Sequence, residues 1–149
     1  MEKDSRRFQR EEERRDKKFG KFEKKMGTPK ARQKIVELRQ KYGVEDTEAS
    51  VRYSSFNHQL AFVIEPSNED FRELIQTKRP KEVHYEFSRP DDAGNPGSMY
   101  IVEGDIQIYS NQYIFGYPPA AFNDYEELGY KREDTYTAPF FGRGKFVRE

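Results

Sequence analysis

Hydrophobic positions are sparse in residues 1–27 and do not form a broad face. At about 100° per residue, the few that occur fall on one narrow helical stripe, formed by Phe8, Phe19, Phe22 and Met26. The segment is otherwise rich in Glu, Lys and Arg, which favour helix formation. It is therefore predicted to form a charged helix whose apolar stripe is too thin to build a core by itself.

A second helix is predicted over residues 29–42. Thr28 is a suitable N-cap, Pro29 suits the first helical position, and Gly43 is a suitable residue to end the helix. The apolar positions recur at spacings of four, three and four residues, which is typical of a helix packed on one side. These positions are Ala31, Ile35, Leu38 and Tyr42.

From residue 51 onward the pattern changes to short β-branched and aromatic runs, separated by polar turns. Asn57-His58 is predicted to form a tight hairpin turn, and Ser67 to cap a helix that ends near Thr77. The sequence beyond Tyr117 loses this periodicity, except for a short helix near residues 124–128. The predicted strands are 51–56, 59–65, 82–88, 99–103, 106–110 and 112–116.

These patterns predict an α+β fold. A charged N-terminal helix and a second short helix precede a five- to six-stranded antiparallel sheet with one packed helix and an irregular C-terminal segment. Residues 1–27 are predicted to be a basic helical arm, and residues 28–149 a single domain. Within that domain, the helix 29–42 precedes an acidic, aromatic-rich sheet region at 51–149.

Charge divides the chain at about the same place. Residues 1–43 hold 16 of the 27 basic and 8 of the 27 acidic residues, so a net charge of +8 is followed by one of −8. Charge asymmetry of this kind bears on partners, not on the fold. An aromatic content of 15% argues against a disordered chain.

Composition also narrows the chemistry. The chain has no cysteine, which excludes disulfides, thiolate metal sites and a cysteine nucleophile. It has no apolar run long enough to span a bilayer and no apolar leader, so a soluble cytoplasmic protein without membrane contact is expected. Phosphate-loop, dinucleotide and serine-elbow motifs are absent. No cofactor and no metal site is predicted.

One pattern could support catalysis. His84 and Glu86 alternate onto one face of a predicted strand, where a histidine and a carboxylate could act as base and acid of a metal-independent nuclease or phosphoesterase. His58 is the other imidazole of the chain, and Arg89 could hold a phosphate. Any wet strand face supplies such pairs by chance, so an enzyme is the less favoured interpretation.

Nucleic-acid binding is a second hypothesis, since basic residues recur around most of the first helix. The neighbouring Glu11, Glu12, Glu13 and Asp16 dilute that charge and also fit a helix stabilised by its own ion pairs. The candidate contacts are Arg6, Arg7, Arg10, Arg14, Arg15, Lys17, Lys18, Lys21, Lys24 and Lys25.

The favoured hypothesis is a small non-enzymatic interaction module, such as an assembly component or an inhibitor. The 10 tyrosines exceed what a small core needs, and tyrosine is enriched in interfaces. An acidic, tyrosine-rich surface would bind another protein or the basic arm of a second copy in a homo-oligomer. The aromatic candidates for partner contact are Phe8, Phe19, Phe22, Tyr100, Tyr109, Tyr113 and Tyr117.

Overall fold

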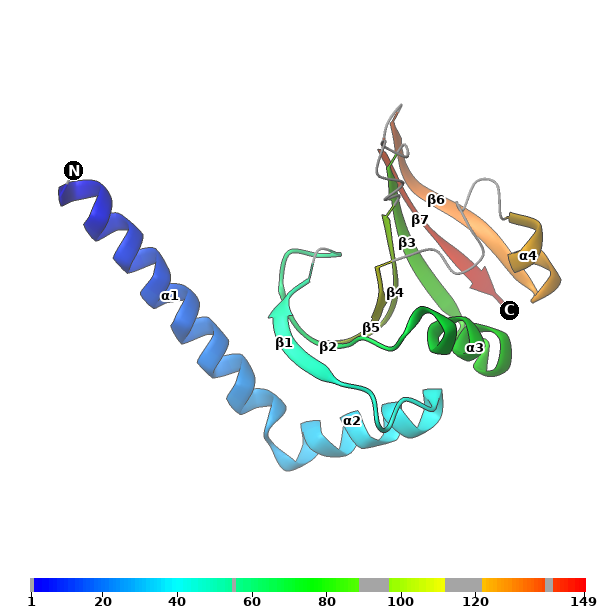
Figure 1. Cartoon of the computed structure of the whole chain (residues 1–149), viewed down its shortest axis with the longest axis horizontal. Helices are drawn as coiled ribbons and strands as arrows, with labels where there is room; N and C mark the ends of the chain where they lie inside the picture. The colour runs from blue at the N-terminus through cyan, green and yellow to red at the C-terminus, as the bar shows by residue number, and fades with distance from the viewer. Residues whose placement is uncertain (1, 55, 89–96, 112–121, 139–140) are drawn as a thin grey trace.

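The structure is a computed structural model and describes residues 2–54, 56–88, 97–111, 122–138 and 141–149 (Figure 1). Its architecture is α+β, as predicted, with helices at the N-terminus followed by one seven-stranded, mostly antiparallel sheet. In the described ranges the elements are α1 Glu2–Met26, α2 Pro29–Tyr42, β1 Ala49–Tyr53, β2 Leu60–Ile64, α3 Asn68–Lys78, β3 Glu82–Ser88, β4 Gly97–Glu103, β5 Ile106–Ser110, α4 Phe122–Glu127, β6 Tyr130–Ala138 and β7 Phe141–Arg148.

Helix α2 begins and ends where its sequence predicts. The hydroxyl of Thr28 accepts the backbone N–H of Ala31 at 3.3 Å, and Pro29 is the first helical residue. Gly43 ends the helix in the left-handed conformation, with φ at 69°. These signals are local, since each satisfies backbone groups that a helix end leaves without partners.

The two shorter helices also lie close to their predicted ranges. Ser67 caps α3 by accepting the backbone N–H of Asp70 at 3.2 Å, and the helix continues one residue beyond the predicted Thr77. Helix α4 starts and ends slightly earlier than the predicted range 124–128. Capping chemistry was therefore sufficient to locate α3 to within about one residue.

The connection between β1 and β2 differs from the prediction. In place of a two-residue turn at Asn57-His58, the strands end at Tyr53 and resume at Leu60. The backbone N–H of Ser54 donates to the carbonyl of Gln59 at 2.8 Å, which closes a longer loop. His58 has φ at 56°, so the turn chemistry of this pair is present within a wider loop.

Long-range strand order is the second difference. The order is β1-β2-β5-β4-β3-β7-β6, and β2 pairs with β5 in parallel while the other neighbours are antiparallel. The predicted strand 112–116, together with Tyr113 and Tyr117, lies outside the described residues. The β4–β5 hairpin, which pairs Met99 with Ser110, is as expected.

The C-terminal segment, predicted to be irregular, forms β6 and β7. Its apolar alternation is hard to see in the sequence because Gly144 occupies an inward position of β7, opposite Tyr85 of β3. A β-carbon on Gly144 would be 2.7 Å from the Glu133 carbonyl oxygen. The position therefore holds no side chain, and the period-two pattern is interrupted.

The core lies between the sheet and the helices α2, α3 and α4. Figure 1 shows a strongly bent sheet with these three helices on its outer side and its concave face turned toward the side from which α1 projects. The largest rings of the core belong to Tyr85, Tyr125, Tyr130, Phe71 and Phe146.

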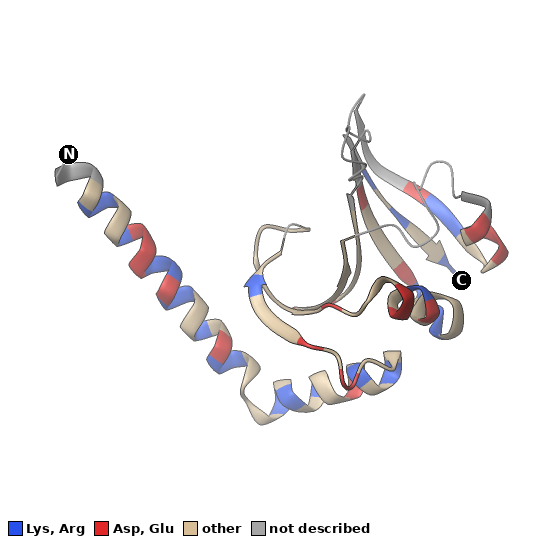
Figure 2. Cartoon of the chain, in the orientation of Figure 1, with Lys and Arg blue, Asp and Glu red and all other residues tan. Residues whose placement is uncertain are grey.

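Within the described ranges, helix α1 contacts the body through its C-terminal turns. Met26 is buried, and the ammonium of Lys25 lies 2.7 Å from the carboxylate of Asp105. The rest of the helix projects from the body, and the ring of Phe8 is 62% exposed. Both signs of charge occur along the projecting part (Figure 2).

Candidate functional site

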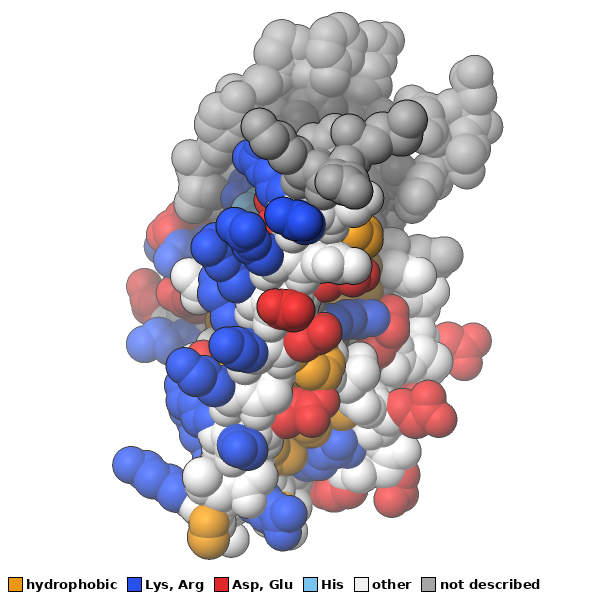
Figure 3. Space-filling model, turned by 90° about the vertical axis from the view of Figure 1, so that its left-hand side faces the viewer, with side chains coloured by type: hydrophobic (Ala, Val, Ile, Leu, Met, Phe, Trp, Pro, Cys, Tyr) orange, Lys and Arg blue, Asp and Glu red, His pale blue; other side chains and the backbone are white. Residues whose placement is uncertain are grey.

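The basic residues of α1 occupy one face of the helix. At about 100° per residue, nine of the ten candidates fall within an arc of about 120°, and Arg15 alone lies outside it. The acidic residues of the helix all fall outside the arc. This corrects the prediction that the cations surround most of the helix, and Figure 3 shows the resulting column of basic side chains. The basic face consists of Arg6, Arg7, Arg10, Arg14, Lys17, Lys18, Lys21, Lys24 and Lys25.

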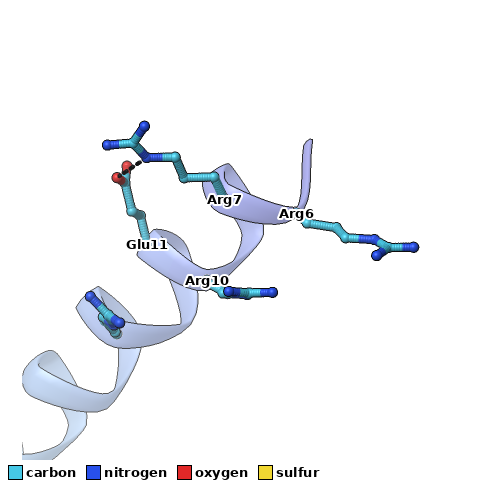
Figure 4. A pocket seen from close by; sticks show the side chains of 5 residues that line it. Arg6, Arg7, Arg10 and Glu11 are labelled. Atoms are coloured by element: carbon cyan, nitrogen blue, oxygen red, sulfur yellow. Dashed lines mark ion pairs between the residues drawn. The ribbon is translucent and has the colours of Figure 1, made fainter. Parts of the chain in front are cut away.

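Most of these cations have no ion-pair partner among the residues that the structure describes. Arg7 lies 3.8 Å from Glu11, and Lys25 pairs with Asp105. In Figure 4, Arg6 and Arg10 extend to one side of the helix, whereas Arg7 turns toward Glu11. No ion pair joins Glu11 to Arg15 or Glu13 to Lys17, although each pair is spaced four residues apart. The basic face is therefore available to an external anion.

A groove lies where α1 meets the loop between β1 and β2. Lys18, Lys21 and Phe22 line it from the helix, and Tyr53 and His58 line it from the body. Its volume is about 430 Å³. Because the three helix residues lie on or beside the basic face, the groove continues that face onto the body. Phe19 and Phe22 are half-buried, so the predicted apolar stripe is used partly within the chain.

A row of rings crosses the concave face of the sheet. Tyr109 and Tyr100 have ring centroids 5.2 Å apart, Tyr100 and Phe56 are 5.4 Å apart, and Phe56 and His84 are 4.9 Å apart. The guanidinium of Arg52 stands 5.1 Å from the centroid of Tyr109. Alternation along β4 and β5 places the tyrosines on this face because their neighbours in sequence point into the core.

The predicted catalytic residues lie in the same region but have other partners. His84 lies 3.6 Å from the Glu82 carboxylate, and Glu86 pairs with Arg143 at 3.2 Å. Burial raises the pKa of Glu86, against the opposing charges of Arg143 and His58. His58 is exposed in its loop. Arg89 lies outside the described residues. This arrangement supports ion pairs at the sheet surface more directly than an acid and a base aimed at one reacting atom.

We expect His84 to make stability depend on pH. Burial lowers its pKa below the ordinary 6.5, although Glu82 opposes this and Lys145 adds to it. Below that ordinary value the unfolded state binds more protons, so the free energy of unfolding should fall as the pH drops from about 6.5 toward the folded-state pKa. Urea unfolding between pH 5 and 8 measures this effect.

The matched variants for that measurement are His84→Gln and His58→Gln. In His84→Gln the free energy of unfolding should fall less as the pH drops than it does in wild type. In His58→Gln it should fall as in wild type, since His58 is exposed. Equal pH profiles for wild type and His84→Gln would contradict this interpretation of the burial of His84.

Most of the described tyrosines serve the core instead of the surface. Tyr100 is 1% exposed, so it cannot reach a partner without movement, and Tyr85, Tyr125 and Tyr130 are equally enclosed. Tyr109 is half-buried, and Tyr53 is exposed. Burial raises the pKa of Tyr130 to about 12, against the opposing charges of Arg148 and Arg79. The hydroxyl of Tyr130 donates to the carbonyl of Pro80 inside the fold. The count of tyrosines thus reflects a core built from rings.

Ser54 and Gln107 were not among the predicted site residues. Gln107 pairs with Val63 in the parallel β2–β5 ladder, a contact that the predicted antiparallel sheet did not include. The sequence does mark Gln107 as unusual, since it is a glutamine between Ile106 and Ile108 in a predicted strand. Residues two apart in a strand lie on the same face of the sheet, so Gln107 is expected beside Tyr109.

Among the described residues, no group of three or more His, Asp or Glu side chains could hold a metal ion. In the same part of the chain, no helix is long and apolar enough to cross a membrane. No family model matches this chain, and neither a curated protein nor a solved structure matches it.

Proposed function

We infer that this protein binds nucleic acid through the basic face of α1. The observation that carries the proposal is the segregation of nine cations onto one face of a projecting helix, with seven of them lacking an ion-pair partner in the described part of the chain. A helix that needed these charges only for its own stability would pair them with its glutamates.

The spacing of the cations suits a phosphate polymer. From Arg6 to Lys25 the basic face extends about 29 Å at 1.5 Å per residue, and it carries nearly two cations per 5.4 Å turn. Nucleic acids carry charges at regular short intervals, so one strand can engage several of these side chains together. Release of condensed counterions then provides the favourable free energy.

Three lysines on the basic face provide a test. The triple substitution Lys17→Gln, Lys18→Gln and Lys21→Gln should weaken binding to a labelled 20-nucleotide single strand. It should also reduce the slope of log affinity against log salt by about 2, at about 0.7 per phosphate contact on single strands. Fluorescence anisotropy of the full-length chain across a salt series measures both quantities.

The matched control neutralises three exposed lysines elsewhere, Lys78→Gln, Lys81→Gln and Lys131→Gln, and changes net charge equally. It should leave the salt slope within about 0.5 of wild type, because its lysines lie away from the basic face. Equal losses in the two triple variants would mean that overall charge, and not this face, attracts the nucleic acid. Absence of binding by the wild type would disprove the proposal.

A protein partner, or a second copy of the chain, is the second candidate. The exposed ring of Phe8 favours it, since an apolar ring on a projecting helix gains from being covered. The burial of most described tyrosines weakens the version in which a tyrosine-rich surface binds the partner. Sedimentation of wild type and Phe8→Ala over a range of concentrations separates self-association from nucleic-acid binding.

A further inference from the structure

The concave face holds a small cavity beside the row of rings. Its volume is about 220 Å³, and Arg52, Tyr53, Ser54, Tyr100, Gln107 and Tyr109 line it. Pockets for drug-sized ligands occupy about 300–1,000 Å³, so this one suits a single ring system.

Gln107 brings an unused hydrogen-bond donor to this cavity. The side chain is 1% exposed, and its carbonyl oxygen accepts the hydroxyl of Ser54 at 2.6 Å. Ser54 in turn accepts the backbone N–H of Phe56 at 3.1 Å, which holds the hydroxyl in place. The amide nitrogen of Gln107 has no hydrogen-bond partner among the described residues. A buried donor without a partner destabilises a fold, so a group that accepts its hydrogen bond would be favoured here.

The remaining walls favour a flat ligand. Half-buried Tyr109 presents its ring to the cavity and packs on the buried ring of Tyr100, with centroids 5.2 Å apart, and Arg52 places its guanidinium against Tyr109. Arg52 also lies 3.5 Å from the carboxylate of Glu65, which positions it at the rim. Aromatic rings and arginine planes are the groups on which nucleobases stack.

The cavity is also connected to the basic face of α1. Tyr53 lines this cavity and also the groove that contains Lys18, Lys21 and His58. A strand whose phosphates lie along the helix would therefore pass the mouth of the cavity. Charge and stacking surface are adjacent, as in proteins that bind unpaired strands.

We propose that this cavity binds one unpaired base of a single-stranded nucleic acid. The inference rests on the proposed function of α1. In it, α1 contacts the phosphates of the ligand and the cavity in the sheet contacts one of its bases. The base packs against the Tyr109 ring beside Arg52, and one of its carbonyl or ring-nitrogen atoms accepts the hydrogen bond of the Gln107 amide. A base within a duplex has its edge paired and its faces stacked, so duplexes gain only the phosphate contacts.

The test compares two single-stranded 12-mers, one with all its bases and one built from abasic nucleotides. Full-length wild type should bind the first roughly 5- to 150-fold more tightly, the range expected for one stacked base. The substitution Tyr109→Ala should remove most of that difference. Tyr109→Phe should keep it, because the ring remains and only the 3.4 Å contact between the hydroxyls of Tyr109 and Ser98 is lost. Gln107→Leu should reduce the difference by about fivefold, as for one hydrogen bond.

The wild-type comparison needs no variant, so misfolding cannot mimic its result. Equal affinity of the wild type for the two 12-mers would overturn the base site and leave phosphate binding by α1 intact. Failure to bind either 12-mer would instead reject the proposed function. A difference that survives in a folded Tyr109→Ala protein, checked by circular dichroism, would also overturn the site, since the base would then be held elsewhere.

Discussion

Replacing Phe146 by alanine is expected to lower the free energy of unfolding by about 3–5 kcal/mol, the usual range for a large buried ring. Phe146 is fully buried in β7. Its ring stacks on Tyr125 of α4 with centroids 3.8 Å apart and also contacts Tyr85 of β3 at 4.9 Å. The variant would leave a cavity between these three elements, which rigid neighbours can fill only in part. Urea denaturation followed by circular dichroism measures the change.

The matched control is Phe8→Ala, the same substitution on an exposed ring of α1. Its free energy of unfolding should stay within about 0.5 kcal/mol of wild type, as for surface changes in general. Similar losses for the two variants would mean that α1 is folded against a partner in solution. A loss below about 1 kcal/mol for Phe146→Ala would contradict the packing of α4 on the sheet.

Replacing Gly144 by alanine is expected to destabilise the protein by about 3 kcal/mol or more, at the upper end for overpacking. The added methyl would overlap the hydroxyl of Tyr85 and would lie 2.7 Å from its Cζ and 2.7 Å from the Glu133 carbonyl. Tyr85 cannot move aside easily, because its ring is buried and its hydroxyl accepts the Arg132 guanidinium at 3.1 Å. Thermal and urea unfolding of the full chain both measure the loss.

Gly20→Ala is the control for this second prediction. Nothing lies within 4 Å of a β-carbon at Gly20, which is an interior residue of α1. The substitution should raise helix stability by about 1 kcal/mol and should not lower the midpoint of unfolding. An equally mild result for Gly144→Ala would show that β6 and β7 can separate from β3 without cost.

The core and the proposed interface are separate parts of this molecule. Phe146 and Gly144 lie on the face of the sheet that α4 covers, whereas Gln107 and Tyr109 lie on the concave face. The variants of Phe146 and Gly144 should therefore change stability but leave the salt dependence of binding unchanged at temperatures where they are folded. This separation allows each surface to be tested without disturbing the other.

Local sequence predicted the helices well because the signals act over three or four residues. Thr28, Pro29 and Gly43 set the ends of α2 through their own backbone chemistry. The strands β3, β4 and β5 were equally visible, since alternation marks a strand with one buried face. The strand order was not predictable in this way, because the parallel contact of β2 with β5 joins segments more than 40 residues apart.

The candidate site likewise has one part that the sequence predicts and one part that depends on the fold. The basic face follows from the sequence once α1 is taken as a helix, because helical geometry alone brings residues three, four and seven apart onto one side. The basic face is not obvious in the linear sequence, because Glu11, Glu12 and Glu13 separate the cations along the chain. Around the helix axis these glutamates lie outside the basic face. The cavity at Gln107 required the fold, because its lining comes from β1, β2, β4 and β5 together.

By itself, the sequence determined a split of charge and the segregation of that charge on α1, because both depend only on composition and on the period of one helix. The tertiary structure decided what becomes of the aromatic residues. Tyrosines that could have formed an outer surface are mostly enclosed in the described core, since the bent sheet needs large rings to fill the space beneath three helices. The same bend brings Tyr109, Arg52 and Gln107 to one cavity, and it places that cavity next to the basic face of α1.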